Sequence, residues 1–112
     1  MAELVTTGTW SVDPTKEVDF IDAWAAFAAW ASSMPGAGTL RLGRDVSVAA
    51  RFVSYAVWED PDAVRAWKSM PEFRERLARV LQHVDDFHAV ELDVVATGAR
   101  SSEAQLSRVR DN

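Results

Sequence analysis

One segment of the chain is apolar on both sides of a predicted strand. Residues 51–59, RFVSYAVWE, are rich in the β-branched and aromatic types that strands favour. Alternate side chains of a strand point to opposite sides, and here both sets are mostly apolar: Val53, Tyr55 and Val57 on one side, Phe52, Ala56 and Trp58 on the other. A sheet with one face in water alternates apolar with polar residues instead. This strand therefore predicts a sheet that is covered on both faces.

The remaining pattern predicts three more strands and two helices. Strands are expected over residues 3–12, 39–44, 51–59 and 87–97. Asp13-Pro14 and Asp60-Pro61 each supply an N-cap followed by proline, so helices should begin there. The first helix should run to about Ser33, and Pro71 should break or kink the second. This order predicts an α+β, ferredoxin-like βαββαβ fold, with both helices on one face of a four-stranded antiparallel sheet.

Length and patterning predict one domain that assembles. The 112 residues are too few for two independent cores, so residues 1–98 are expected to form one domain and residues 99–112 a polar, frayed tail. The two helices can cover only one face of the sheet. A second copy of the chain could bury the apolar side chains of the other face, so we expect a homodimer.

Charge and composition exclude several classes of partner and site. A formal charge of −5 repels phosphate backbones, so no nucleic acid is expected. Without cysteine there is no disulfide or thiolate metal site. No apolar run approaches the roughly 20 residues of a membrane span, and residues 1–10 lack the features of a secretion signal. We therefore expect a soluble cytoplasmic protein that does not bind membranes.

The central part of the chain resembles the antibiotic biosynthesis monooxygenase family. The resemblance lies in an apolar strand followed by several short motifs: Trp58-Glu59, Asp60-Pro61, Ala66-Trp67 and the Pro-Glu-Phe-Arg step of residues 71–74. With the helix of Phe20 and Trp24 and the turn at Pro35-Gly36, it covers about residues 3–97. It implies a dimeric α/β barrel, with one pocket per subunit between helices and sheet. It also implies chemistry such as cofactor-independent oxygenation of aromatic phenols, haem degradation or quinol oxidation.

Departures from the family pattern narrow these activities. The haem-degrading branch carries an asparagine where Thr7 stands and a haem-ligating histidine where Leu77 stands. The polyketide branch shares Trp67, but has an asparagine at the place of Ala63 and a tyrosine at the place of Phe73. No cofactor is therefore expected, and the resemblance to either branch is partial.

Trp67 is the first candidate for the site. It is either a core residue of the second helix or a pocket residue whose indole N–H binds a ligand oxygen. The candidates for binding a small aromatic substrate beside it are Phe20, Trp24, Phe27, Phe73 and Thr7.

Two further residues are candidates for catalysis. Strand alternation puts His88 on the apolar side of Val90, Leu92 and Val94, where it is either a buried neutral histidine or a base that deprotonates a phenol. Tyr55 is either core or a pocket donor. The carboxylates at 85, 86, 91 and 93 have no histidines at ligand spacing, so no metal site is expected.

Two functions remain open at this point. The first is a cofactorless oxygenase whose ionised phenol or quinol substrate reacts directly with O₂. The second is a dimer that binds a small molecule, or serves a structural role, without catalysis. The distinguishing feature is whether His88 or Tyr55 reaches the pocket beside Trp67.

Overall fold

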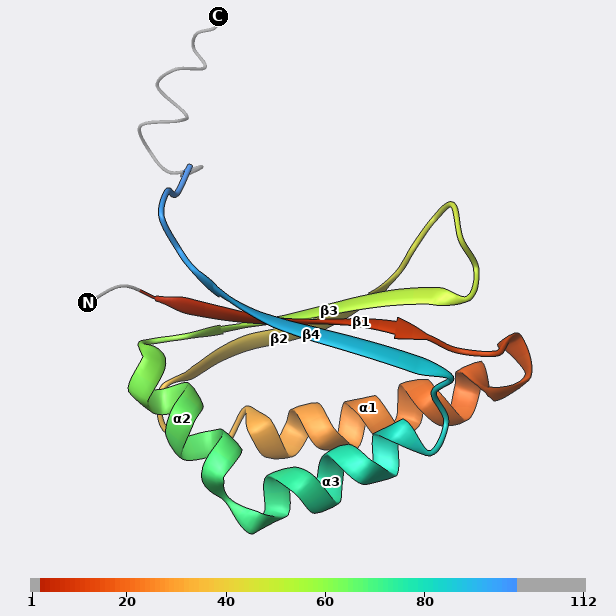
Figure 1. Ribbon diagram of the computed structural model, residues 1–112, viewed down its shortest axis with the longest axis horizontal. Coiled ribbons are helices and arrows are strands. Elements are labelled where there is room, and N and C mark those ends of the chain that lie inside the picture. Colours follow the sequence, from red (N-terminus) through yellow and green to blue (C-terminus); the bar gives the residue numbers. More distant parts are fainter. Residues whose placement is uncertain (1–2, 99–112) are drawn as a thin grey trace, which may run out of the picture.

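The computed structural model describes residues 3–98 and forms one sheet covered by helices on a single face (Figure 1). Its elements are β1 (Leu4–Ser11), the 3-10 turn η1 (Pro14–Lys16), α1 (Glu17–Ala31), β2 (Ala37–Arg44), β3 (Arg51–Trp58), α2 (Pro61–Ser69), α3 (Pro71–Leu81) and β4 (Asp86–Asp93). All strand pairs are antiparallel, in the order β2-β3-β1-β4. The predicted ferredoxin-like fold is confirmed. No helix within residues 3–98 is long and apolar enough to span a membrane.

The ends of several elements differ from the prediction. β4 stops at Asp93 rather than Thr97, because Asp93 lies opposite Leu4, the first residue of β1. β2 begins at Ala37 rather than Thr39, since Ala37 pairs with Trp58 ahead of an irregularity in the register. The first helix opens with a 3-10 turn. The predicted tail at residues 99–112 lies outside the described residues.

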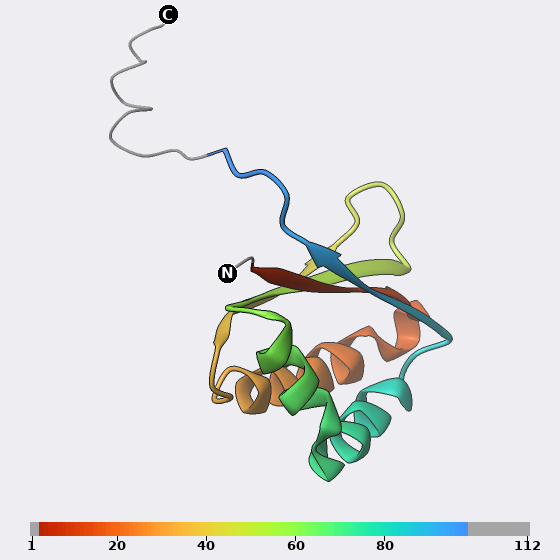
Figure 2. The same cartoon turned by 60° about the vertical axis from the view of Figure 1, so that its left-hand side comes forward.

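The predicted break at Pro71 divides the second helix into α2 and α3. Asp60 caps α2 by accepting a hydrogen bond of 2.9 Å from the Ala63 N–H. Met70 has extended backbone angles, as expected for the residue before a proline, and it ends α2 and precedes α3. The turn lets α2 lie near β3 while α3 packs along α1, and both helices stay on one side of the sheet (Figures 1 and 2).

The inner face of the sheet, which faces the helices, carries bulky rings toward one end. In the strand register, Trp10 of β1 lies between Phe52 of β3 and Phe87 of β4. Trp10 stacks on Phe87 with ring centroids 4.1 Å apart, and Phe20 of α1 packs against both Trp10 and Phe52. Toward the other end of the sheet, Trp58 is completely buried. These rings make up much of the core.

The row next to Trp10 is made of small residues. Gly8 of β1 lies between Ser54 of β3 and Ala89 of β4. A Cβ atom at Gly8 would lie 2.9 to 3.0 Å from atoms of Phe87, Ser54 and Trp10, closer than a normal contact. The inner face therefore has a low centre of small residues, and the side chains of Phe87, Ser54 and Trp10 lean over Gly8.

The outer face of the sheet, which faces away from the helices, remains apolar and open in the single chain. Val53, Tyr55 and Leu92 are 44%, 43% and 49% exposed. The strand register places His88 and Val90 on this same face, so the predicted alternation of β4 is confirmed up to Leu92. The sheet thus has the two apolar sides that residues 51–59 predicted.

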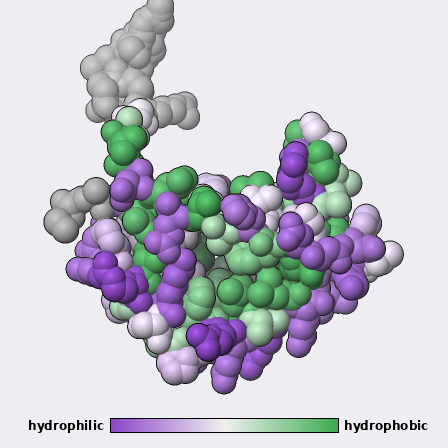
Figure 3. All heavy atoms as spheres, in the orientation of Figure 1, coloured by the Kyte–Doolittle hydropathy of each residue, from purple (hydrophilic) through white to green (hydrophobic). Residues whose placement is uncertain are grey.

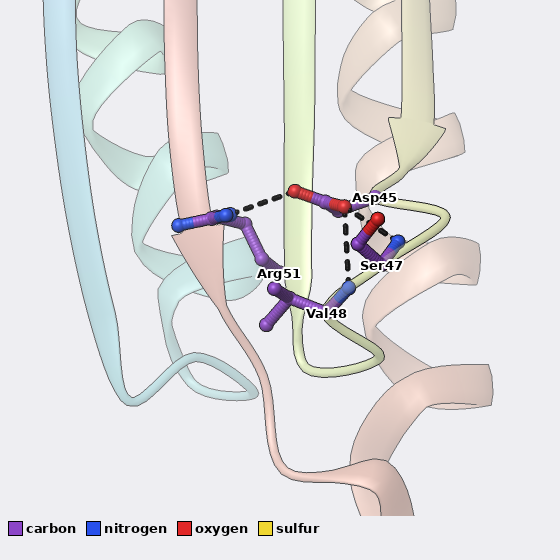
Figure 4. A network of polar contacts seen from close by, with 4 residues as sticks. All are labelled: Asp45, Ser47, Val48 and Arg51. Carbon is purple, nitrogen blue, oxygen red and sulfur yellow. Dashed lines mark hydrogen bonds and ion pairs between the residues drawn. The ribbon is translucent and has the colours of Figure 1, made fainter.

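The loop between β2 and β3 rises from the sheet on the side of the outer face (Figure 1). Asp45 organises it by accepting hydrogen bonds from the N–H groups of Ser47 and Val48 and from Arg51 Nε at 2.8, 3.2 and 2.9 Å (Figure 4). These donors, the Ser47 N–H first, hold the pKa of Asp45 below its ordinary value. The loop is therefore fixed by a charged group.

Replacing Asp45 by asparagine tests this arrangement. Because its folded-state pKa is lowered, the carboxylate stabilises the fold above its ordinary pKa of 3.8, and this contribution is lost as the pH falls through the folded-state value. We expect Asp45→Asn to melt at a lower temperature than the unmodified protein near neutral pH. The two melting temperatures, followed by circular dichroism, should converge in strong acid. A difference that stays constant into acid would contradict the role of the charge.

Candidate functional site

A cavity of about 260 Å³ lies between the inner face of the sheet and the helices. Its volume is near the lower end of the range of small-molecule sites, roughly 300–1,000 Å³. The sheet contributes its low centre, and the helices contribute Trp24 and Phe27 from α1, Trp67 from α2 and Phe73 from α3. In the space-filling view, hydrophobic side chains gather between sheet and helices around a hollow (Figure 3). The cavity suits a small aromatic molecule.

Trp67 is the centre of the aromatic group that borders the cavity. Its ring stacks on Trp58 with centroids 4.5 Å apart, meets the edge of Phe73 at 4.8 Å and lies 5.8 Å from Phe27. Only 5% of Trp67 is exposed. These contacts fix the orientation of the indole, so its polar atom cannot turn toward solvent without disrupting the packing.

Three indole N–H groups in and beside the cavity wall differ in whether they have a hydrogen-bond partner. Trp10 Nε1 donates to Ser54 Oγ at 3.0 Å, and Trp58 Nε1 donates to Thr6 Oγ1 at 3.2 Å. Trp67 Nε1 is buried and has no hydrogen-bond partner among the described residues. An unsatisfied buried donor costs about 1–3 kcal/mol. Such a cost is compensated if a ligand oxygen accepts the hydrogen bond.

The sequence model of the antibiotic biosynthesis monooxygenases matches residues 4–79 of the chain. The chain belongs to this family. The predicted resemblance is confirmed, and the matched segment includes every element from β1 to most of α3.

Solved structures agree with the fold of the antibiotic biosynthesis monooxygenase family. SnoaB, a cofactor-independent oxygenase from Streptomyces nogalater, is 23% identical, with a TM-score of 0.74 over 89% of this chain and 98% of SnoaB. A SnoaB variant is 22% identical, with a TM-score of 0.78 over 85% of this chain and 95% of the variant. A candidate antibiotic biosynthesis monooxygenase from Deinococcus radiodurans is 15% identical, with a TM-score of 0.76 over 88% of this chain and 98% of the other. No curated protein matches this chain in sequence.

Most of the predicted site residues come together at the cavity of this family member. Trp67, Trp24, Phe27 and Phe73 line it. Thr7 and Tyr55 also border it, but from positions whose alternation turns their side chains toward the outer face. Tyr55 is 43% exposed there.

Two predicted site residues lie elsewhere. Phe20 is completely buried in the core between Trp10 and Phe52 and does not line the cavity. His88 is exposed on the outer face, opposite Thr9 of β1. Within one subunit, the sheet therefore separates its imidazole from Trp67.

The sequence analysis missed several residues of the cavity. Gly8, Ser54, Thr6 and Lys68 line it but were not considered as site residues. Ser54 could have been noticed, because it is a polar residue on the otherwise apolar inner side of β3. The low centre of the sheet depends on the register between strands, which no local signal specifies.

The cavity does not fit haem in the manner of the haem-degrading branch. Leu77, the residue that the family resemblance puts at the position of that branch's haem ligand, lines the cavity. No histidine is found among the lining residues in the described part of the chain. The described lining residues therefore offer no imidazole to an iron.

Replacing Gly8 by alanine tests the low centre of the sheet. The added methyl group must displace Phe87, Ser54 or Trp10, so the bond between Trp10 and Ser54 should weaken. We expect a loss of about 1–3 kcal/mol in the free energy of unfolding, as for other overpacked positions. Chemical denaturation followed by tryptophan fluorescence measures this loss. Gly43→Ala is the control, because its added Cβ would come no closer than 3.9 Å to the Val53 carbonyl oxygen. Equal losses at both positions would contradict the interpretation.

Proposed function

We propose that this protein is a cofactor-independent monooxygenase that acts on a small aromatic phenol or quinol. The supporting observation is the buried indole N–H of Trp67, which lacks a partner among the described residues and belongs to a ring that lines an aromatic cavity. A planar phenol or anthrone would pack against the rings of Phe27 and Phe73 and offer an oxygen to this donor. Family membership and the fold shared with SnoaB, a cofactor-independent oxygenase, support the same reaction class.

The chemistry requires no external reductant. When a ring methylene of an anthrone becomes a carbonyl, the carbon loses two hydrogens and gains one oxygen atom of O₂, and the other oxygen atom leaves as water. The substrate supplies all four electrons. Loss of a proton gives an electron-rich anion that reacts with O₂, and preorganised donors such as the Trp67 N–H stabilise that anion. The protein contributes orientation and anion stabilisation.

One observation favours the second candidate function, a binding protein without catalysis. His88 lies on the far side of the sheet from Trp67, and the Tyr55 side chain points to the outer face. In the described part of the chain, no histidine, aspartate or glutamate that could remove the substrate proton lines the cavity. Catalysis would then be limited to substrates acidic enough to ionise without a base from this cavity.

Replacing Trp67 by phenylalanine separates these functions. Phenylalanine retains most of the ring but removes the donor, so about 1–3 kcal/mol of binding or transition-state free energy should be lost. The free energy of unfolding should change by about 1 kcal/mol or less. The packing lost with the smaller ring is offset by the removal of an unsatisfied N–H. Oxygen uptake with anthrone- and hydroquinone-type substrates measures turnover, and thermal melts measure stability.

Trp30→Phe is the matched control for this experiment. Trp30 lies 6.5 Å from Trp67 between ring centroids, but does not line the cavity. It should change neither substrate affinity nor turnover. Unchanged turnover in a folded Trp67→Phe protein would remove Trp67 from the site. Absence of turnover with every substrate, together with retained ligand binding, would favour the binding protein.

The homodimer is also a proposal, supported by the outer face of the sheet. Val53, Tyr55, Val90 and Leu92 are each 41–49% exposed on this face. Apolar patches of a few hundred Å² are close to the limit for a soluble monomer. The loop between β2 and β3 rises along this side (Figure 2), and its Val46 is fully exposed. A second copy of the chain would bury these groups and form the α/β barrel of the family.

Sedimentation equilibrium tests this assembly. We expect a mass of about twice 12.4 kDa at micromolar concentration. Val53→Asp and Leu92→Asp should each shift the mass toward the monomer, because a charge buried at an apolar interface is strongly unfavourable. A monomer in the unmodified protein would disprove the proposal.

A further inference from the structure

An ion pair beside the cavity joins α2 to β4. Lys68 of α2 is the one charged residue that lines the cavity in the described part of the chain. Its Nζ lies 2.5 Å from Oε2 of Glu91 on β4. The Lys68 side chain is 33% exposed, so it lies at the boundary between cavity and solvent. A charged group therefore stands at the opening of an otherwise uncharged cavity.

The strand register places this pair next to other polar groups. Glu91 lies opposite Thr6 on the inner face, and Thr6 accepts the Trp58 N–H. Ser54, which also lines the cavity, accepts the Trp10 N–H. Each hydroxyl still has a hydrogen to donate, since neither is a donor in any hydrogen bond between the described residues. The polar side chains directed at the cavity thus have donors to offer.

Donors select ligands that carry acceptor oxygens. The hydroxyls of Thr6 and Ser54 and the Lys68 ammonium can each donate to an oxygen with negative charge, and the unpaired Trp67 N–H lies on a ring of the same lining. Hydrogen bonds to an ionised oxygen are about twice as strong as those between neutral groups. The cavity therefore offers an ionised ligand oxygen a set of donors, and the ammonium is the group that can offset the cost of removing that charge from water.

Glu91 competes with a ligand anion, because its carboxylate pairs with the Lys68 ammonium. Its side chain is 46% exposed, and exposed ion pairs contribute little to folding. The pair can therefore open at small cost when another anion reaches the ammonium. A ligand anion that lies partly within the apolar cavity is screened less by water than Glu91 is, so it gains more from Lys68.

We propose that Lys68 determines the charge specificity of the cavity: its ammonium leaves Glu91 and binds the ionised oxygen of an aromatic ligand at the opening. This inference rests on the proposed function, because it assigns the form in which the phenol or quinol is bound. The ammonium of Lys68 would also favour loss of the substrate proton, because a nearby cation stabilises the ionised form of the substrate. This effect would partly replace the base that the cavity lining lacks. Glu91 is then a competitor that limits the affinity for anions.

Two probes of equal size test the proposal by isothermal titration calorimetry on the full chain. 2-Naphthoate is ionised at neutral pH, and 2-naphthamide is its neutral counterpart. We expect the unmodified protein to bind naphthoate more tightly. Lys68→Met retains the length of the side chain and should weaken naphthoate binding about tenfold, leaving naphthamide unchanged. Glu91→Gln frees the ammonium and should strengthen naphthoate binding about threefold, again without effect on naphthamide.

The opposite effects of the two variants exclude a merely structural role. Loss of fold would weaken both probes together, and thermal melts of both variants check it. The proposal is overturned if Glu91→Gln does not strengthen naphthoate binding, if Lys68→Met affects both probes equally, or if neither probe binds. Oxygen uptake is measured separately. Charge selectivity without oxygen uptake would end only the proposed oxygenase, whereas uptake without charge selectivity would end only the role of Lys68.

Discussion

The contrast between large rings and small residues on the inner face of the sheet determines where the functional site can be. Trp10 and Trp58 project toward the helices from two ends of this face, while Gly8 and Ala56 lie between them. Helices that rest on tall rings cannot descend onto the small residues, so a space remains. Side-chain packing normally fills such spaces to the density of organic crystals. Here the cavity is retained because the rings that border it also form the core.

The same rings determine the polarity of the cavity. Trp10 and Trp58 use Ser54 and Thr6 as acceptors, and this leaves the hydroxyl hydrogens for a ligand. Trp67, held by its stacking on Trp58, has a donor and no acceptor. Structure and site are thus connected through a few indole groups. A change at any of these tryptophans would therefore alter both the core and the cavity.

Local signals in the sequence predicted the elements well and the site only in part. Proline after aspartate located the start of α2, and the proline at position 71 located the break before α3, because both act within a few residues. The alternation of β4 correctly placed His88 with Val90. It could not show that this side faces away from Trp67. That relation depends on which side of the sheet the helices cover, a property of the whole fold.

The low centre of the sheet also has a consequence for the shape of any ligand. Phe87, Ser54 and Trp10 lean over Gly8, because a Cβ atom there would lie 2.9 to 3.0 Å from each of them. Aromatic rings therefore border the cavity on both sides: Trp10 and Phe87 from the sheet, and Trp24, Phe27, Trp67 and Phe73 from the helices. Flat fused rings can lie between two such aromatic surfaces in full contact, whereas the puckered rings of the hydrogenated compound are thicker and would touch them at fewer atoms. The cavity would therefore distinguish aromatic compounds from their hydrogenated counterparts by thickness alone, before any polar group is recognised.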